Sequence, residues 1–418
     1  MVTAGGKDMM LDGLTVLPRP GSRLRTPVPR TTLPEGFRDP ASGHGWDGAP
    51  VWTEFSRSDG RVGVVVRHRA PEATAVSVAV SGWFRPDPPA ACDLEPVGHG
   101  WWAAAFTVPG DWQASYSFLE HRGPVGRTGF PAGPVPDRES GQGAAPWHGG
   151  DLHRLPRLVP GDPGLCRATV SEVARVCPRR PWLDAYGTPC PEMTVTLPAR
   201  SPEEPVVRLW RSPSARPETP VPLVVVFDGE GHVDRLGTPL VLRDAEQAGV
   251  VPPVAVAFVS AGPARSEDLG VPGGQAEWVA GVLVPRLHAE GVLGAVDRTG
   301  TVVTGASFGG LSALFALARS GGRIGAAVAQ SVSYWRYRTP DLDNALAAAL
   351  RGGDAVVRLQ SGRYEGDSAQ RAQELAALLR RQGGDATART VSGGHDWAWW
   401  IPEMVEELGG LLSRSGRP

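Results

Sequence analysis

From about residue 193 onward, continuous apolar runs alternate with segments of helical length, and this alternation constrains the fold more than any other feature of the chain. The apolar runs predict strands in "PLVVVFDGEG" (222–231), "PPVAVAFVSAG" (252–262), "TVVTGAS" (301–307), "IGAAVAQS" (324–331), "DAVVRLQSG" (354–362) and "TARTVSGGHD" (387–396). Helices are predicted at 277–291, 310–321, 368–384 and 402–414. Strands that are apolar on both faces are typical of a mostly parallel sheet covered by helices on both sides.

The residues before 193 follow a different pattern. Short β-branched or aromatic runs at 61–70, 73–84, 100–110 and 114–123 are separated by Gly, Pro and Asp, as in an all-β sandwich. We therefore predict an irregular arm over 1–45, a β-sandwich that shapes the substrate site over 46–125, and a catalytic α/β domain over 193–418. Residues 126–192 are rich in Pro and Gly and are predicted to be a linker, with a short helix near 171–176.

Composition excludes several classes of function. The net charge of -2 gives no support for binding to a nucleic acid or an anionic membrane. The N-terminus carries no apolar run of signal-peptide length and no run could cross a bilayer, so a cytoplasmic location is expected. Separately, we expect a monomer. Because Cys92, Cys166, Cys177 and Cys190 have no C-x-x-C spacing, we expect reduced thiols rather than a zinc site, and we expect no metal site or cofactor.

The segment "GASFG" (305–309) matches the pattern G-x-S-x-G at the point where a buried strand meets a helix. In a nucleophile elbow the glycines allow a sharp turn that presents the serine hydroxyl at the helix N-terminus. Chance matches are expected in a chain with 54 glycines, and a serine at this place could simply cap the helix. The strand-to-helix context favours Ser307 as a nucleophile.

Chain order identifies partners for Ser307. In an α/β hydrolase the acid and then the histidine follow the nucleophile, and His395 is the only histidine after Ser307. It lies in a loop after the last predicted strand. The acid is expected in "SGRYEGD", where we favour Glu365 and Asp367 is a competitor; a Ser–His dyad is a further alternative. Asp396 adjoins His395, so its side chain should point away from the imidazole and shape the loop.

An oxyanion hole requires two backbone N–H donors. One is expected from Phe308, directly after the nucleophile. The other is expected from Gly229 or Glu230 in "DGEG", although this segment by itself also fits a plain turn.

At these residues the sequence resembles the enterochelin (enterobactin) esterases. The segments "VVVFDGEG", "VTGASFGGLSALFAL", "QSVSYWRYR", "LQSGRYE" and "GGHDWAWW" carry the resemblance in the catalytic part, with "ARSEDL" as a looser match. The segments "WFRPD" and "GWWAAAFTVPGDWQASYSFLEHR" carry it in the N-terminal part, so that it covers about residues 50 to 412. The resemblance implies an α/β hydrolase preceded by a β-sandwich.

The resemblance also implies an activity, the hydrolysis of the ester backbone of a siderophore, in ferric or iron-free form. It makes Ser307 the nucleophile, His395 the general base and Glu365 the acid, and it places Arg265, Trp335 and Arg336 at the border of the substrate. Arg338 and Trp397 lie near the same predicted loops and would suit an anionic, aromatic ligand.

The chain departs from the family pattern in "DLEPVGHG" and in the segment after the sandwich, which leaves the identity of the siderophore open. Two other functions are compatible with the sequence. One is an acyl esterase acting on a decorated carbohydrate or another natural-product ester, and the other is a non-catalytic protein that binds a siderophore or a glycan.

Overall fold

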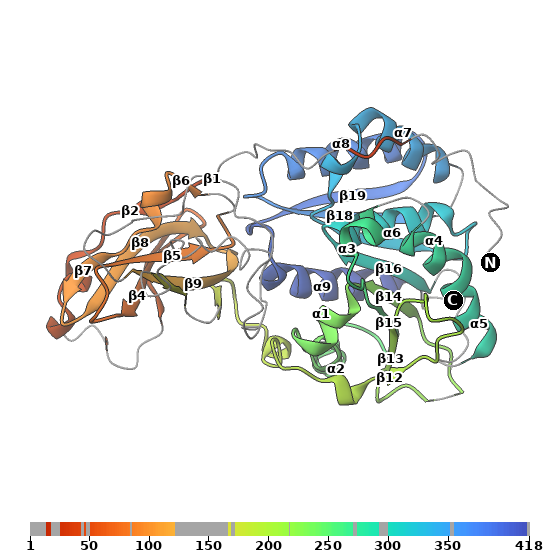
Figure 1. The fold of residues 1–418 in the computed structure, drawn as a ribbon, viewed down its shortest axis with the longest axis horizontal. Helices are drawn as coiled ribbons and strands as arrows, with labels where there is room; N and C mark the ends of the chain where they lie inside the picture. The colour runs from red at the N-terminus through yellow and green to blue at the C-terminus, as the bar shows by residue number, and fades with distance from the viewer. Residues whose placement is uncertain are drawn as a thin grey trace.

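The structure is a computed structural model of the 418-residue chain. It describes residues 14–17, 26–42, 46, 51–83, 86–121, 166–168, 172–216, 218–270, 274–291, 300–351 and 355–415. These residues form a β-sandwich and a larger α/β unit, which lie side by side and are drawn at the left and right of Figure 1.

The α/β unit is built on a sheet of eight strands in the order β12-β13-β15-β14-β16-β17-β18-β19. The six strands β15, β14, β16, β17, β18 and β19 are mutually parallel. Strand β13 pairs antiparallel with β15, and β12 pairs antiparallel with β13. The strands are β12 (Val195–Thr196), β13 (Val207–Arg211), β14 (Leu223–Phe227), β15 (Ala255–Val259), β16 (Thr301–Ala306), β17 (Ala326–Gln330), β18 (Val356–Gly362) and β19 (Asp385–Val391). The predicted parallel sheet is therefore confirmed.

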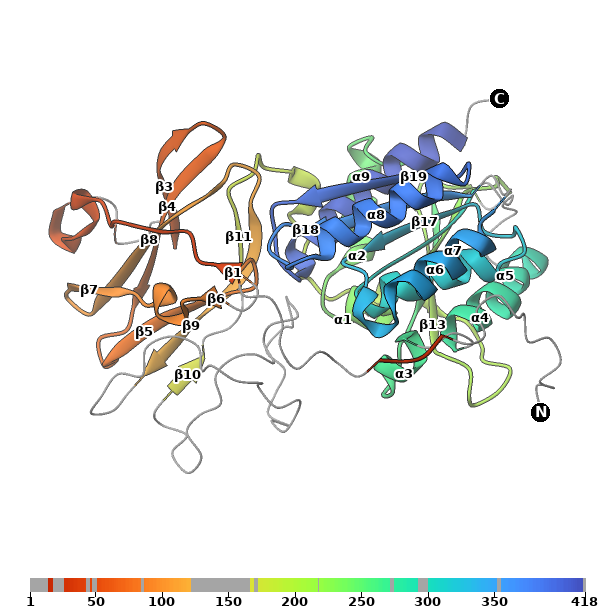
Figure 2. The same ribbon diagram turned by 90° about the horizontal axis from the view of Figure 1, so that it is seen from above.

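Helices cover both faces of this sheet, because successive strand residues point to opposite sides. The helices are α1 (Gly229–Asp234), α2 (Thr238–Gln247), α3 (Arg265–Gly270), α4 (Gln275–Trp278), α5 (Val284–Glu290), α6 (Phe308–Arg319), α7 (Thr339–Ala349), α8 (Ser368–Arg381) and α9 (Trp397–Ser415). One face of the sheet packs against α3 to α8, and Figure 2 shows α6, α7 and α8 on this side. The other face packs against α1, α2 and α9.

The β-sandwich consists of two antiparallel sheets. One contains β2 (Arg30–Thr31), β3 (Trp52–Ser58), β4 (Arg61–Arg69), β7 (Glu95–Gly98) and β8 (Trp101–Pro109). The other contains β5 (Ala75–Val80), β9 (Gln113–His121), β10 (Cys166–Ala168) and β11 (Glu172–Arg175). Valines of β4 and β5 and aromatic residues of β8 and β9 fill the space between the sheets.

The first 45 residues depart from the prediction of an irregular arm. Within them, β1 (Thr26–Pro27), β2 and two 3-10 helices (Glu35–Phe37 and Pro40–Ser42) are formed. Leu33 and Phe37 are buried with Trp46 on the outer face of β4 and β8, against Val65. The sequence of the arm lacks periodicity because isolated apolar side chains pack onto a sheet, whereas a periodic pattern arises when one face of a helix or strand is buried.

The helix predicted near 171–176 is also wrong. Residues 172–175 form strand β11, which pairs antiparallel with β9 from Glu172 opposite Tyr116 to Arg175 opposite Gln113. Backbone hydrogen bonds to β9 outweighed the weak local preference of this segment for a helix. Most of the predicted linker, including His148 and His153, lies outside the described residues. Among the cysteines of the described part, Cys92, Cys177 and Cys190 are free thiols.

Candidate active site

Ser307 occupies the turn between β16 and α6. Its backbone has φ 60° and ψ −117°, and its side chain makes no capping hydrogen bond to α6, which weighs against a simple helix cap. Gly305 explains why the turn can close, since a Cβ there would lie 2.6 Å from the carbonyl carbon and oxygen of Gly309. This strand–turn–helix geometry is that of a nucleophile elbow.

His395 and Glu365 form a close pair. His395 Nδ1 lies 2.6 Å from Glu365 Oε1, and the two side chains are 24% and 4% exposed. The other carboxylate oxygen of Glu365 accepts hydrogen bonds from Gly362 N at 2.7 Å and Ser331 Oγ at 2.8 Å. A carboxylate held in this way fixes the ring orientation of its histidine and favours the tautomer with the proton on Nδ1.

Asp367, the competing acid, has a different position. It is exposed and occupies the cap position of α8, where its carbonyl oxygen accepts from Arg371 N at 2.9 Å. The sequence favoured Glu365, and the structure pairs His395 with Glu365.

The loop after β17 contacts both Ser307 and the acid. Ser333 N donates to Ser307 O at 3.2 Å, and the two hydroxyl oxygens also lie 3.2 Å apart. Ser331, two residues earlier, donates to Glu365 and accepts a hydrogen bond from Trp400 Nε1 at 2.8 Å. The sequence analysis did not identify Ser331 or Ser333.

Strand order explains why these residues meet. Ser307 follows β16, Ser331 and Ser333 follow β17, Glu365 follows β18 and His395 follows β19. These four strands are parallel and adjacent, so their carboxyl ends form one edge of the sheet. That edge is where open α/β sheets carry their ligand sites.

Three of the predicted substrate residues surround Phe308, the residue after Ser307. The ring of Trp335 packs edge-on against it at a centroid distance of 5.5 Å. The guanidinium groups of Arg265 and Arg336 lie 5.9 Å and 5.7 Å from the centre of the same ring. Arg265 also forms a two-point ion pair with buried Asp228, with Nη2 2.8 Å from Oδ2.

The other two predicted substrate residues do not join this group. Arg338 is 68% exposed at its side chain, and its Nε lies 4.0 Å from Asp341. Trp397 is only 1% exposed and packs edge-on against His232 and Trp400 in the core under α9. The prediction that Trp397 contacts substrate is therefore wrong, because the first turn of α9 points it into the protein.

The predicted oxyanion donors begin two neighbouring helices. Phe308 starts α6 after β16, Gly229 starts α1 after β14, and β14 and β16 pair in parallel register. The two turns approach closely, since a Cβ on Gly309 would lie 3.0 Å from Asp228 Oδ2. The carboxylate of Glu230 accepts from Ala261 N at 3.0 Å, and burial together with Asp228 raises the pKa of Glu230.

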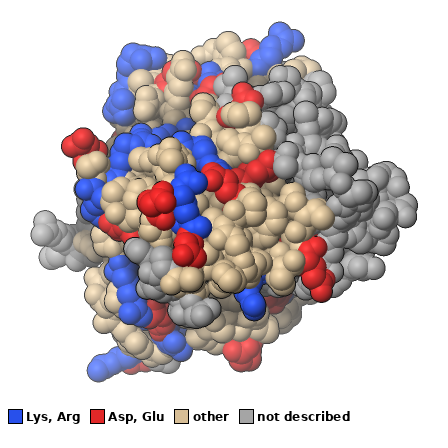
Figure 3. All heavy atoms as spheres, turned by 90° about the vertical axis from the view of Figure 1, so that its left-hand side faces the viewer, with Lys and Arg blue, Asp and Glu red and all other residues tan. Residues whose placement is uncertain are grey.

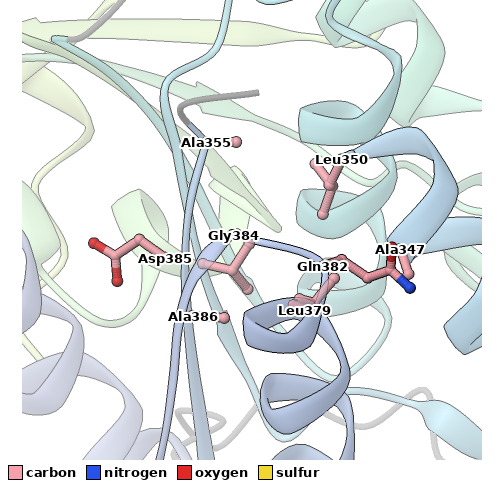
Figure 4. Close-up of a pocket in the computed structure, with 9 residues that line it drawn as sticks. Ala347, Leu350, Ala355, Leu379, Gln382, Gly384, Asp385 and Ala386 are labelled. Carbon is pink, nitrogen blue, oxygen red and sulfur yellow. The ribbon is translucent and has the colours of Figure 1, made fainter. Parts of the chain in front are cut away.

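Other features of the described residues do not compete with this site. A small hollow lined by Leu350, Ala355, Leu379 and Asp385 lies at the amino ends of β18 and β19, at the opposite edge of the sheet from Ser307 (Figure 4). No cluster of three His, Cys, Asp or Glu side chains suited to a metal ion occurs in the described ranges. Among the described helices, none is long and apolar enough to span a membrane.

Comparison with known proteins agrees with this geometry. Residues 203–411, half of the chain, match the family model "Esterase: Putative esterase". The chain belongs to the esterase family. The match contains the elbow at Ser307, the acid loop at Glu365 and the histidine loop at His395.

Curated relatives match just under half of the chain. An iron(III) salmochelin esterase of Escherichia coli O6:H1 is 30% identical over 207 residues, covering 46% of this chain and 50% of the relative. An iron(III) enterobactin esterase of Dickeya dadantii is 28% identical over 226 residues, covering 49% and 52%. The chain thus spans about half the length of the curated relatives that it matches.

Solved structures extend the likeness in fold to the β-sandwich. A ferric enterobactin esterase of Salmonella typhimurium superposes with a TM-score of 0.68 at 21% identity, covering 88% of this chain and 98% of that one. An enterobactin esterase of Shigella flexneri, determined in the presence of enterobactin, gives 0.63 at 20% identity, covering 91% and 99%. The expected α/β-hydrolase fold with a preceding sandwich, and the resemblance to the enterochelin esterases, are confirmed.

Proposed function

We propose that this esterase cleaves the ester bonds of a siderophore backbone with Ser307, His395 and Glu365 as its catalytic triad. The observation that supports it most is the close pair of His395 Nδ1 and Glu365 Oε1, 2.6 Å apart, at the sheet edge that also carries the elbow of Ser307. Along the chain the proposed nucleophile comes first, then the acid and then the base, which is the order found in α/β hydrolases.

In the proposed reaction, His395 Nε2 accepts the proton of Ser307 as its Oγ attacks the ester carbonyl carbon. Glu365 holds the opposite ring nitrogen and stabilises the imidazolium that forms. The tetrahedral oxyanion accepts hydrogen bonds from the backbone N–H groups of Phe308 and of Gly229 or Glu230. The imidazolium then protonates the leaving alkoxide. A water molecule activated by His395 hydrolyses the acyl-enzyme and releases the carboxylic acid product.

The substrate class follows from the relatives together with the residues around Phe308. The matched relatives are named for salmochelin and enterobactin, and a catecholate siderophore is an anionic, aromatic polyester. Arg336 and Trp335 offer a cation and an aromatic face next to the nucleophile. Arg265 is already paired with Asp228, so its proposed contribution is to hold the wall of the site. Iron would enter and leave with the substrate.

A product analysis with Ser307→Ala tests the proposal. We expect the wild-type protein to linearise or fragment an enterobactin-like trilactone, and the variant to fold normally but to lose turnover by roughly 10⁴-fold or more. Mass spectrometry of products from a panel of iron-free and ferric siderophores gives the measurement and ranks the substrates. Retained turnover in the variant would refute Ser307 as the nucleophile.

Labelling with a fluorophosphonate separates the remaining alternatives. A covalent adduct on the peptide that carries Ser307 would exclude a non-catalytic binding protein. An adduct without cleavage of any siderophore would instead direct the search to acylated carbohydrates and other natural-product esters. A cytoplasmic location and a monomeric state remain predictions from the sequence.

A further inference from the structure

The loop that carries His395 is attached to the β-sandwich through its next residue. Asp396 is completely buried, and its carboxylate accepts hydrogen bonds from Ser81 Oγ, from Ser115 N and, at 2.8 Å, from Ser115 Oγ. Ser81 follows β5 and Ser115 lies on β9, so both belong to the sandwich. On the α/β side, the carboxylate accepts a hydrogen bond from Ala398 N, at 3.0 Å, in the first turn of α9. Most of its donors therefore come from the other unit.

A buried carboxylate depends on such donors. Desolvation raises the pKa of Asp396 above its ordinary value, and the hydrogen bonds from Ser81, Ser115 and Ala398 oppose that rise. A carboxylate that stayed buried under the sandwich but lost the sandwich donors would have to move toward water or bind a proton, since an unpartnered buried charge is costly. The position of the loop is consequently coupled to the presence of the sandwich donors.

The backbone of the same loop also fits closely against the sandwich. Gln113 N, at the start of β9, donates to Ser392 O at 3.2 Å. At Gly394 a Cβ would collide with the carbonyl oxygen of Ser81, so only glycine permits this approach. Two of the three positions before His395, Ser392 and Gly394, are thus part of the contact.

The loop that carries Glu365 has its own contact. Thr26 Oγ1, on strand β1, donates to Tyr364 O at 3.0 Å. The ring of Tyr364 packs against the apolar core between the two sandwich sheets. Tyr364 N also donates to Gly393 O at 3.1 Å, which links the acid loop to the histidine loop. The loops that carry Glu365 and His395 therefore both contact the sandwich, and they contact each other.

The nucleophile turn is held differently: Ser307 N donates to Gln330 O at 2.9 Å, and Ser333 N donates to Ser307 O, and both partners belong to the α/β unit. We propose that the β-sandwich positions the acid and base of the triad, and that Asp396, held by Ser81 and Ser115, is the positioning residue that keeps the His395 loop in place. This inference rests on the proposed function of Ser307, His395 and Glu365. Asp396 itself contacts no reacting atom, and it acts through the residue beside it.

The test removes the sandwich hydroxyls in the full-length protein. In Ser81→Ala/Ser115→Ala, Asp396 loses two of its hydrogen bonds while every residue of the α/β unit is unchanged. The matched control is Ser77→Ala, which removes a buried hydrogen bond within the sandwich, 2.5 Å to Asp93. We expect the double variant to lose about 10- to 100-fold in kcat with little change in KM, because misplacement of a catalytic group by about 1 Å has this effect. The control is expected to keep the wild-type kcat.

A second readout does not depend on the substrate. The Nδ1 proton that His395 shares with Glu365 should give a downfield proton NMR signal, identified by its loss in Glu365→Gln. We expect the signal to be present in the wild type and in Ser77→Ala, and to be lost or broadened in the double variant. Ser115→Thr, which retains a hydroxyl, should keep it. If the double variant does not fold, as judged by circular dichroism, Ser81→Ala alone and Asp396→Asn take its place.

The outcomes distinguish the two proposals. A folded double variant with an unchanged signal and unchanged kcat would overturn the positioning role and leave the triad intact. A wild-type protein that shows the signal but resists fluorophosphonate labelling would overturn the proposed hydrolysis, whereas loss of the signal in the double variant would still support positioning by the sandwich.

Discussion

Ser307 is held in a backbone conformation that few residues other than glycine adopt. Its φ of 60° and ψ of −117° lie outside the regions that side chains normally favour, and such a conformation costs on the order of 1–3 kcal/mol. The surrounding structure fixes it from both sides: Ser307 N donates to Gln330 O at 2.9 Å, and Leu311 N donates to Ser307 O at 3.2 Å. The turn presents the hydroxyl outside the helix, where a substrate can reach it.

Glu365 and Asp367 provide a matched pair for testing the acid. We expect Glu365→Gln to lower kcat by about 10³- to 10⁴-fold, because the amide cannot hold the required histidine tautomer or stabilise the imidazolium. Asp367→Asn should leave kcat within about twofold of the wild type, since Asp367 is exposed at the start of α8. Steady-state kinetics on the preferred ester gives the comparison. An equal loss in both variants would show that the loop as a whole, and not Glu365, is required.

Residue types and chain order were sufficient to predict that Ser307, Glu365 and His395 follow strands at one edge of the sheet, whereas their catalytic roles stay a prediction. They were insufficient for Ser331 and Ser333, because a serine in a loop carries no signal until the register of β17 places it between β16 and β18. They also failed for Trp397. Trp400 packs edge-on against His395 at 4.8 Å, and Trp397, one turn earlier on the same face of α9, packs against Trp400 and His232 in the core.

At the scale of elements, helix α1 carries a buried histidine. His232 Nδ1 lies 2.9 Å from Thr238 Oγ1, and Nε2 has no hydrogen-bond partner among the described residues. Burial lowers the pKa of His232 from 6.5 to about 4, with Asp228 opposing the shift. The neutral ring packs edge-on against Trp397, so this histidine contributes to the core under α9.

This burial predicts an acid-dependent loss of stability. Between pH 6.5 and about 4 the unfolded chain binds a proton that native His232 does not bind, so the free energy of unfolding must fall as the pH falls through that range. The full effect is roughly 3 kcal/mol, of which roughly 2 kcal/mol is lost by about pH 5. Urea unfolding at two pH values, wild type against His232→Gln, measures it. A variant with the same pH dependence as the wild type would contradict the assignment.

Elements were predicted best where they are long and buried on both faces, as in β14, β16 and α6. They were predicted worst where tertiary pairing decides the conformation. Residues 172–175 form a strand because they pair with β9. Residues 26–42 are ordered because Leu33 and Phe37 pack on the apolar surface around Val65. Neither partner is adjacent in sequence, so no local pattern could show it.

At the scale of the whole molecule, charge is balanced locally. The face of the sandwich seen in Figure 3 carries basic and acidic side chains close together. The sandwich and the arm packed on it contain the ion pairs Arg57–Glu54 and Arg38–Glu35. The net charge of -2 for the whole chain gives no support for long-range attraction of polyanions. Recognition of an anionic siderophore is therefore expected to depend on a few arginines at the site, such as Arg336.

The contact around Asp396 predicts how the two units unfold. We expect one cooperative transition for the wild type, because the buried carboxylate is satisfied only when sandwich and α/β unit are docked. Ser81→Ala/Ser115→Ala should separate this into two transitions. Calorimetry, with tryptophan fluorescence as a second probe, tests it. Two separate transitions already in the wild type would show that the contact contributes little to stability.

The order in which the chain is made gives this contact a temporal meaning. The sandwich strands β3 to β9 leave the ribosome well before the loop around His395, which lies between β19 and α9. With the proposed triad, a nascent chain would carry the hydroxyl of Ser307 for the time needed to add almost ninety further residues, from 307 to 395, before the proposed base is made. The proposed active site would become competent only when the His395 loop closes onto a sandwich that was synthesised earlier.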